Sequence, residues 1–186
     1  MDGGRRAWKH LWSTPVPQKI KIFAWKLATE GLATMQNRMR TNLESDSTCR
    51  LCGRGEEDGY HAVVACTKSR ALREELKKDW DLLPEDMLVR SNPEWFLLLL
   101  DKLDTEVKAQ ILFCFWRAWH LRNDAVHRKG SALVEASTTF VKNYEGVHSA
   151  VAKATGWSAP TKGSNPGCRT FMLRGLPLEF SYQKHL

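Results

Sequence analysis

Long apolar runs are absent from this sequence of 186 residues. The longest, residues 95–100 and 111–116, have six residues each, whereas a membrane-spanning helix needs roughly 20. We therefore expect no membrane segment. The first residues also lack the apolar stretch of a secretory signal. Asp2, and the absence of any serine before Ser13, disfavour an organelle-targeting peptide, so we expect a location in the nucleus or the cytoplasm.

The sequence also lacks strand signals and common catalytic motifs. It contains no long alternation of apolar and polar residues, no glycine-rich phosphate-binding loop and no Ser/His/Asp arrangement. At 42% hydrophobic residues, with eight Trp and seven Phe, the chain can nevertheless bury a core. We therefore predict a mainly α fold and a protein that is not an enzyme, without catalytic residues or a small-molecule substrate.

Helical periodicity places the expected elements. Residues 18–31 carry Ile20, Phe23, Ala24 and Leu27 on one face, and a short helix after Thr34 is expected to turn Met35, Met39 and Leu43 inward. Further helices are predicted after Lys68, over residues 104–127 with Thr105 as the N-cap, and over residues 133–154. The inward faces predicted for the two helices between residues 68 and 127 are Ala71, Leu72 and Leu76, and Val107, Ile111, Cys114, Phe115, Ala118, Trp119 and Arg122.

Three parts follow from these patterns. We predict a small helical module over residues 7–80, a helical segment over 81–157, and a flexible basic tail over 158–186, where Pro, Gly and Ser are frequent.

Positive charge lies at the two ends of the chain. Residues 1–43 carry a net charge of +6, residues 44–157 carry −2 and residues 158–186 carry +3. This distribution favours contact with nucleic acid, RNA or DNA, through phosphates and without base readout; a solvated basic face without a partner is the alternative. The residues that we predict to contact phosphate are Lys19, Lys21, Lys26, Arg38 and Arg40. Base stacking on Trp8, Trp12 and Trp25 is the weaker hypothesis, because tryptophans at helical spacing usually belong to a core.

One cysteine and histidine motif predicts a metal site. Cys49, Cys52, His61 and Cys66 form the pattern C-x2-C-x8-H-x4-C, in a segment with three glycines. Three thiolates and one imidazole complete the tetrahedral shell of a structural zinc site, which leaves no open position for water or substrate. The predicted cofactor is therefore one Zn²⁺ with a structural role.

Two other readings of these cysteines remain open. The thiols could be unrelated and buried, or Cys49 and Cys52 could form a redox pair, although a redox pair is expected between a strand and a helix. The odd number of cysteines, five, does not suggest a complete disulfide framework.

Further residues carry a resemblance to a known family. The segments 8–12 (WKHLW), 16–25 (VPQKIKIFAW) and 32–34 (LAT), followed by the metal motif and by Glu57 and Asp58, resemble the zinc-binding domain that follows the reverse transcriptase in plant non-LTR retrotransposon polyproteins. The resemblance covers roughly residues 7–80. Residues 116–123 are similar to the helical linker of those polyproteins, and residues 157–163 are similar to the start of their ribonuclease H domain.

The departures from this family limit what the resemblance implies. The sequence has no polymerase segment, and beyond Trp157 its only acidic residue is Glu179, whereas two-metal nuclease chemistry needs several carboxylates. The resemblance implies a non-enzymatic zinc-binding module derived from a retrotransposon polyprotein, with weak nucleic-acid contact. The alternative is a module adopted by the host for protein–protein interaction, in which zinc is structural and a helix face with Phe113, Trp116 and Trp119 binds a host protein.

Overall fold

The computed structural model of this chain describes residues 3–90, 92–127 and 133–154. Over these ranges the chain is helical and forms no strand, and Thr48 and Glu56 make only an isolated antiparallel bridge. The prediction of a mainly α fold is confirmed. The predicted tail, residues 158–186, lies outside the described residues.

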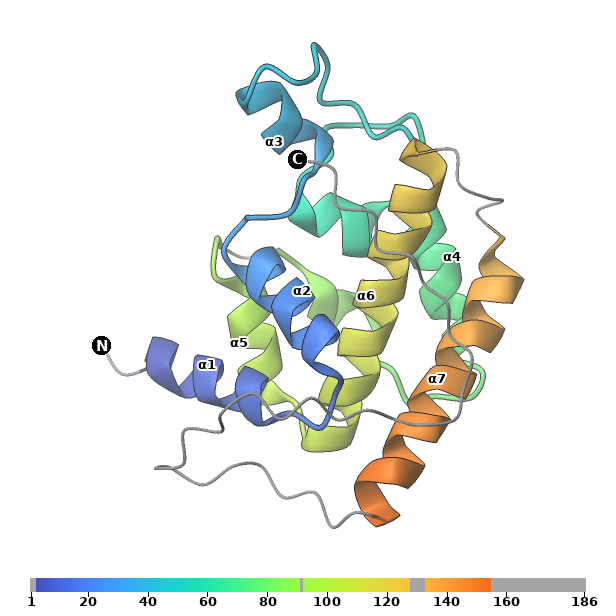
Figure 1. Cartoon of the computed structure of the whole chain (residues 1–186). Coiled ribbons are helices and arrows are strands. Elements are labelled where there is room, and N and C mark those ends of the chain that lie inside the picture. Colours follow the sequence, from blue (N-terminus) through green and yellow to red (C-terminus); the bar gives the residue numbers. More distant parts are fainter. Residues whose placement is uncertain (1–2, 91, 128–132, 155–186) are drawn as a thin grey trace.

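The helices surround one long central helix. In chain order the elements are α1 (Gly3–Ser13), α2 (Gln18–Ala28), α3 (Met35–Arg40), the π-helix η1 (His61–Ala65), α4 (Thr67–Leu76), the 3-10 helix η2 (Glu85–Leu88), α5 (Trp95–Lys102), α6 (Thr105–Val126) and α7 (Val134–Ala154). Helix α6 contacts α2, α4, α7 and η1, while α1 packs on α5 and α2 (Figure 1). Among the described residues, no helix has both the length and the apolar character for a membrane crossing.

Helix α6 occupies the centre because its apolar residues cover most of its circumference. The predicted inner face is largely buried, but Leu112, Phe113 and Trp116 are buried as well, and a helix that is apolar on several sides needs neighbours on several sides. Its N-cap is Asp104, whose carboxylate accepts hydrogen bonds from the backbone N–H groups of Glu106 and Val107, both at 3.0 Å. The prediction of Thr105 as the cap was therefore wrong by one residue.

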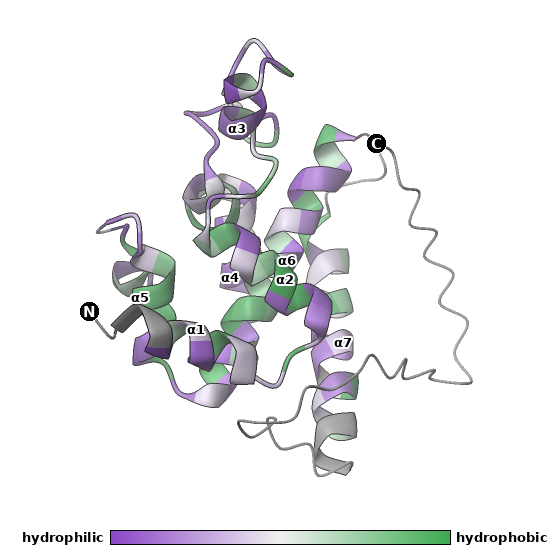
Figure 2. Cartoon of the chain, turned by 60° about the vertical axis from the view of Figure 1, so that its left-hand side comes forward, coloured by the Kyte–Doolittle hydropathy of each residue, from purple (hydrophilic) through white to green (hydrophobic). Residues whose placement is uncertain are grey.

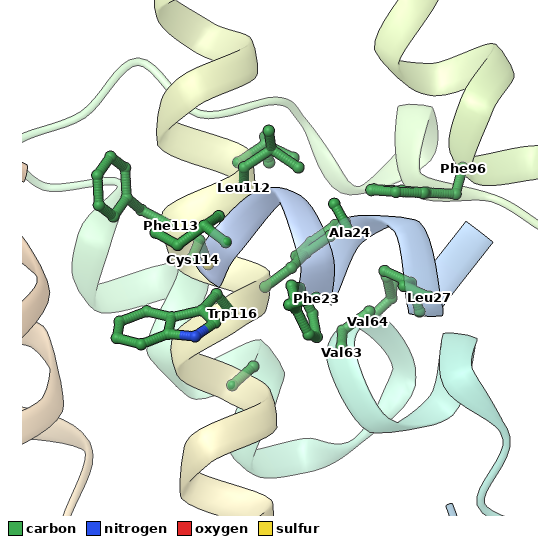
Figure 3. Packing of buried hydrophobic residues seen from close by; sticks show 14 of the residues in the cluster. Phe23, Ala24, Leu27, Val63, Val64, Phe96, Leu112, Phe113, Cys114 and Trp116 are labelled. Atoms are coloured by element: carbon green, nitrogen blue, oxygen red, sulfur yellow. The ribbon is translucent and has the colours of Figure 1, made fainter. Parts of the chain in front are cut away.

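One hydrophobic core joins the N-terminal and C-terminal halves of the described chain. Figure 3 shows Phe23, Ala24 and Leu27 of α2 beside side chains of η1, α5 and α6. The predicted inner faces of α2 and α4 are confirmed in the main, with Ala71 only half-buried. Residues on both sides of position 80 belong to this one core. The predicted boundary between residues 80 and 81 therefore does not separate two cores, and the division of the chain into parts stays a prediction.

Helix α3 differs from the prediction. Met35 is buried, but Met39 is 38% exposed and Leu43 is 67% exposed. The helix ends at Arg40, and Asn42 has a φ of 56°, so the helical period that would turn Leu43 inward does not continue. Helix α3 and the loop after it project from one end of the helical body (Figure 1), and α3 is largely hydrophilic (Figure 2).

Candidate metal centre

The four predicted ligands lie together. The sulfurs of Cys49, Cys52 and Cys66 and a ring nitrogen of His61 are all within 4.8 Å of one another, although the sequence separates the first from the last by 17 positions. In a tetrahedral shell with metal–sulfur distances near 2.3 Å, ligand atoms are about 3.8 Å apart. The cluster therefore needs a contraction of no more than about 1 Å to fit the zinc geometry.

A tight turn brings Cys49 and Cys52 together. The N–H of Gly53 donates to the carbonyl of Cys49 at 2.8 Å, and the N–H of Cys49 donates to the carbonyl of Gly55 at 3.1 Å. Both glycines have left-handed backbones, with φ values of 66° and 62°, which other residues adopt only at a cost. Glycine at these two positions therefore permits the turn that points both thiols to one side.

The π-helix η1 brings His61 and Cys66 to the same side. The N–H of Cys66 donates to the carbonyl of His61 at 2.8 Å, five residues earlier. In an α-helix, residues five apart are rotated by about 140° from each other, whereas the wider π turn places them nearly one above the other. The ring Nε2 of His61 lies 3.3 Å from the sulfur of Cys52, so the imidazole closes the cluster from this helix.

Hydrogen bonds among the side chains of the cluster shift their pKa values. The hydrogen bond with Cys66, together with burial, raises the pKa of the Cys49 thiol to about 12. The same bond lowers the pKa of Cys66, and hydrogen bonding to Cys49 raises the pKa of His61 to about 9. A cation can bind only deprotonated thiolates and a neutral imidazole, so metal binding at this site near pH 7 would release protons.

Two acidic residues of the loop have separate roles. The carboxylate of Asp58 accepts a hydrogen bond from the backbone N–H of His61 at 2.7 Å and forms an ion pair with Arg90. Asp58 therefore holds the backbone of a predicted ligand. Among the described residues, the Glu57 carboxylate is hydrogen-bonded to Met35 and Arg122 rather than to a side chain of the cluster.

Glu57 is fully buried. It connects the loop between α3 and η1, which carries Cys49 and Cys52 and is called the metal loop, to α3 and α6. Its Oε1 accepts hydrogen bonds from the backbone N–H of Met35 at 2.9 Å, and from Nε and Nη2 of Arg122 at 2.9 and 2.6 Å. Three consecutive acidic residues, Glu56, Glu57 and Asp58, are typical of a solvated loop, but Glu57 is buried. The available signal was Arg122 itself, because an arginine on an apolar helix face requires a buried partner.

A second buried arginine forms hydrogen bonds with the backbone of η1. Arg73 of α4 is fully buried and donates to the carbonyls of Val63 and Val64 at 3.1 and 2.8 Å. It also pairs with Glu85, and this hydrogen bond with Arg73 lowers the pKa of Glu85 to about 2. The wide turn of a π-helix leaves carbonyls without α-helical partners, and Arg73 supplies two of those hydrogen bonds. Sequence reasoning missed this residue.

The five predicted phosphate-binding residues are in different environments. Lys19, Lys26 and Arg40 are exposed. Arg38 is half-buried and pairs with Glu44 at 3.1 Å. Lys21 is 5% exposed, and its ammonium donates to the carbonyl of Trp12 at 2.7 Å.

Burial also lowers the pKa of Lys21. A side chain in this position is not open to a phosphate group in solution. The prediction that Lys21 contacts phosphate was therefore wrong.

The helix face suggested for protein interaction belongs to the core. Phe113 is 1% exposed and Trp116 is 5% exposed, and both rings pack against Tyr144 of α7. Only Trp119 is half-buried, with Arg122 against its ring. This face is covered by the chain itself, so that suggestion was wrong. The isolated Cys114 is also buried, and burial raises the pKa of its thiol to about 12, which makes it unreactive.

Comparisons with known proteins agree with this geometry. Residues 3–72 match the family described as zinc-binding in reverse transcriptase. A protein of Arabidopsis thaliana that carries the name of a ribonuclease H protein is 30% identical over 56 residues, which is 30% of this chain and 9% of that protein. No solved structure gives a significant match. All four residues of the metal cluster lie within the segment that matches this zinc-binding family.

Proposed function

We propose that Cys49, Cys52, His61 and Cys66 bind one Zn²⁺ and that this ion has a structural role. The observation that carries the proposal is the convergence of three sulfurs and one imidazole nitrogen within 4.8 Å, in a segment that matches a zinc-binding family. Soft thiolates with one imidazole are the donor set that zinc prefers in structural sites.

A zinc ion held by four protein ligands would stabilise the loop between α3 and η1. This loop has few apolar contacts of its own, since Leu43 is exposed and Ser47, Cys49 and Glu57 are its main buried residues. Structural zinc sites contribute on the order of 10–16 kcal/mol of apparent binding free energy. Because the shell is closed, no ligand position remains for water or substrate, and we propose a module that is not an enzyme.

We further propose that the module contacts nucleic acid through its exposed basic residues. Lys19 and Lys26 lie on α2 and Arg40 ends α3, and the first 43 residues carry a net charge of +6. Arg38 is a weaker candidate, because a phosphate would have to compete with Glu44. Contacts of this kind position a phosphate chain without reading bases, so the expected binding to RNA or DNA is weak and sensitive to salt.

Metal analysis of the purified full chain tests the first part. We expect one zinc per chain, retained through gel filtration, and a large drop in the melting temperature after treatment with a strong chelator. Cys52→Ser is expected to lose the metal, whereas Cys168→Ser, a cysteine outside the motif, is expected to keep it. A folded protein without bound metal would contradict the proposal.

A salt titration tests the second part. We expect the logarithm of the association constant for an oligonucleotide to fall linearly with the logarithm of the salt concentration, with a smaller slope after Lys19→Gln and Lys26→Gln. Lys78→Gln is the matched control. Lys78 is also an exposed lysine, but it lies after α4, far from α2 in the sequence, and it already pairs with Glu75. If no oligonucleotide binds even at low salt, nucleic-acid contact is refuted and a host protein becomes the partner to seek.

A further inference from the structure

Helix α2 has an exposed face that neither the core nor the metal cluster uses. We define the α2 surface as Lys19, Ile22, Trp25 and Lys26, all of which are exposed. At about 100° per residue these positions span a sector of about 120°, opposite the buried face of the helix. Ile22 is 43% exposed and Trp25 is 44% exposed. Nearly half of the Trp25 surface is therefore open to a partner.

The α2 surface is also basic. Helix α2 contains no acidic residue, and Lys19 and Lys26 are seven residues apart, which is about 10 Å along the helix axis. The ammonium of Lys19 lies over the rings of Trp116 and Tyr144, at 4.8 and 4.5 Å from their centroids. These contacts hold the charge at the junction of α2, α6 and α7, and they leave it positive because the rings are neutral. The two lysines line one edge of the surface and Trp25 lies at the other.

This arrangement fits a partner with a row of negative charges to pair with the two lysines and a flat aromatic group beside that row to stack on Trp25. Phosphates of any nucleic acid meet the first requirement. Only unpaired bases meet the second, because the faces of paired bases in a duplex are covered by their neighbours, whereas splayed bases stack on aromatic side chains. An acidic peptide would satisfy the lysines alone.

We propose that the α2 surface binds unpaired nucleotides of RNA or DNA, with a base stacked on Trp25 and the phosphate chain beside Lys19 and Lys26. The inference rests on the proposed nucleic-acid contact and adds that single strands are preferred over duplexes. Ile22, which lies between the two edges, supplies apolar contact to the sugar or the base edge. The interaction requires no particular sequence, since every base has a face that can stack.

Substitutions at Trp25 separate stacking from charge. Fluorescence anisotropy with labelled dT and rU oligomers of about a dozen nucleotides covers the site size of such surfaces, and a blunt DNA duplex of the same length serves as the comparison. We expect Trp25→Leu to weaken binding of both single strands by about fivefold or more, and to leave duplex binding unchanged. Trp25→Phe keeps an aromatic face and is expected to retain most of the affinity. Because Trp25 is exposed, thermal unfolding of both variants should match the parent chain.

The outcomes distinguish this inference from the function on which it rests. Lys19→Gln and Lys26→Gln should each reduce the salt slope for single strands by about 0.7. If the lysine changes weaken binding but Trp25→Leu and Trp25→Phe behave alike, stacking is refuted and phosphate contact stands. Equal affinity for single strand and duplex would likewise overturn the inference. Binding of polyglutamate with the same dependence on Trp25 would replace nucleic acid with an acidic protein, and absence of any binding at low salt would refute both proposals.

Discussion

The buried pair of Glu57 and Arg122 joins the metal loop to the central helix, and its removal should be costly. Both side chains are almost completely buried, with exposed fractions of 0% and 2%, and two hydrogen bonds connect them. Arg122→Met leaves a buried carboxylate that keeps the hydrogen bond from the backbone N–H of Met35 but has no counter-charge beside it. Breaking one side of a buried ion pair costs about 3–5 kcal/mol, so we expect the free energy of unfolding to fall by that amount.

A double-mutant cycle tests whether the cost comes from the pair itself. Glu57→Gln keeps an acceptor for Met35 but leaves the Arg122 guanidinium without a counter-charge. The double variant with Gln at 57 and Met at 122 removes both charges together, and we expect it to be more stable than either single variant, because replacing both partners of a buried pair is often close to neutral. Urea unfolding of the zinc-loaded protein, followed by circular dichroism, measures all four free energies.

The neighbouring Glu56 provides the matched control. It undergoes the same chemical change in Glu56→Gln, but it is exposed, and its carboxylate accepts only a long hydrogen bond of 3.5 Å from the side chain of Gln36. We expect its effect to stay within about 0.5 kcal/mol. If the effects of the Glu57 and Arg122 substitutions add within about 0.5 kcal/mol, the two side chains are independent and the reasoning is refuted.

Three further predictions follow from the geometry of single residues. The pKa of Glu85 is lowered from 4.5 to about 2, so its ionised form contributes stability that is complete above pH 4.5 and is lost as the pH falls towards 2. Glu85→Gln should therefore flatten the acid side of a plot of unfolding free energy against pH. An unchanged slope would contradict the pairing with Arg73. Asp104→Ala removes the cap of α6 and should cost about 1 kcal/mol in urea unfolding, while Glu106→Ala, in the same turn, should cost less. Gly53→Ala forces a left-handed backbone on alanine and should lower the free energy of unfolding by about 1–2 kcal/mol. Gly146→Ala, in α7 where a Cβ meets nothing within 4 Å, should be neutral or stabilising. Equal effects of the two changes would show that the φ of Gly53 does not matter for stability.

The sequence predicted those parts of the fold that depend on local patterns. Apolar residues at helical spacing identified α2, α4 and α6, and the spacing of Cys49, Cys52, His61 and Cys66 identified the cluster. The helix α3 was only partly predicted, because the positive φ of Asn42 ends the period before Leu43. Helix α1 and helix α5 were not predicted as separate elements, since each is short and gains its stability from packing on the other.

Long-range polar contacts were beyond what the sequence could predict. Glu57 and Arg122 are 65 positions apart; the place of Arg122 on an apolar helix face indicates that it needs a buried partner, but nothing near it in the sequence identifies Glu57. The π-helix is equally hard to predict, because two of its carbonyls, those of Val63 and Val64, accept hydrogen bonds from Arg73 of the following helix. Surface and interior lysines also cannot be separated by charge, as Lys21 demonstrates.

The metal cluster and the helical core depend on the same short segment. In η1, His61 points its ring to the cluster while Val63 and Val64 are buried in the core, and Cys66 follows one residue after its end. Glu57 adds a second connection, from the loop to α6. A zinc finger that folds alone has no such connections, so in this chain loss of the ion should loosen η1 and, through it, the contact with α6. A zinc ion at this site would therefore stabilise more than the loop that carries Cys49 and Cys52, because the other two predicted ligands, His61 and Cys66, lie in or directly after the π-helix that packs in the core.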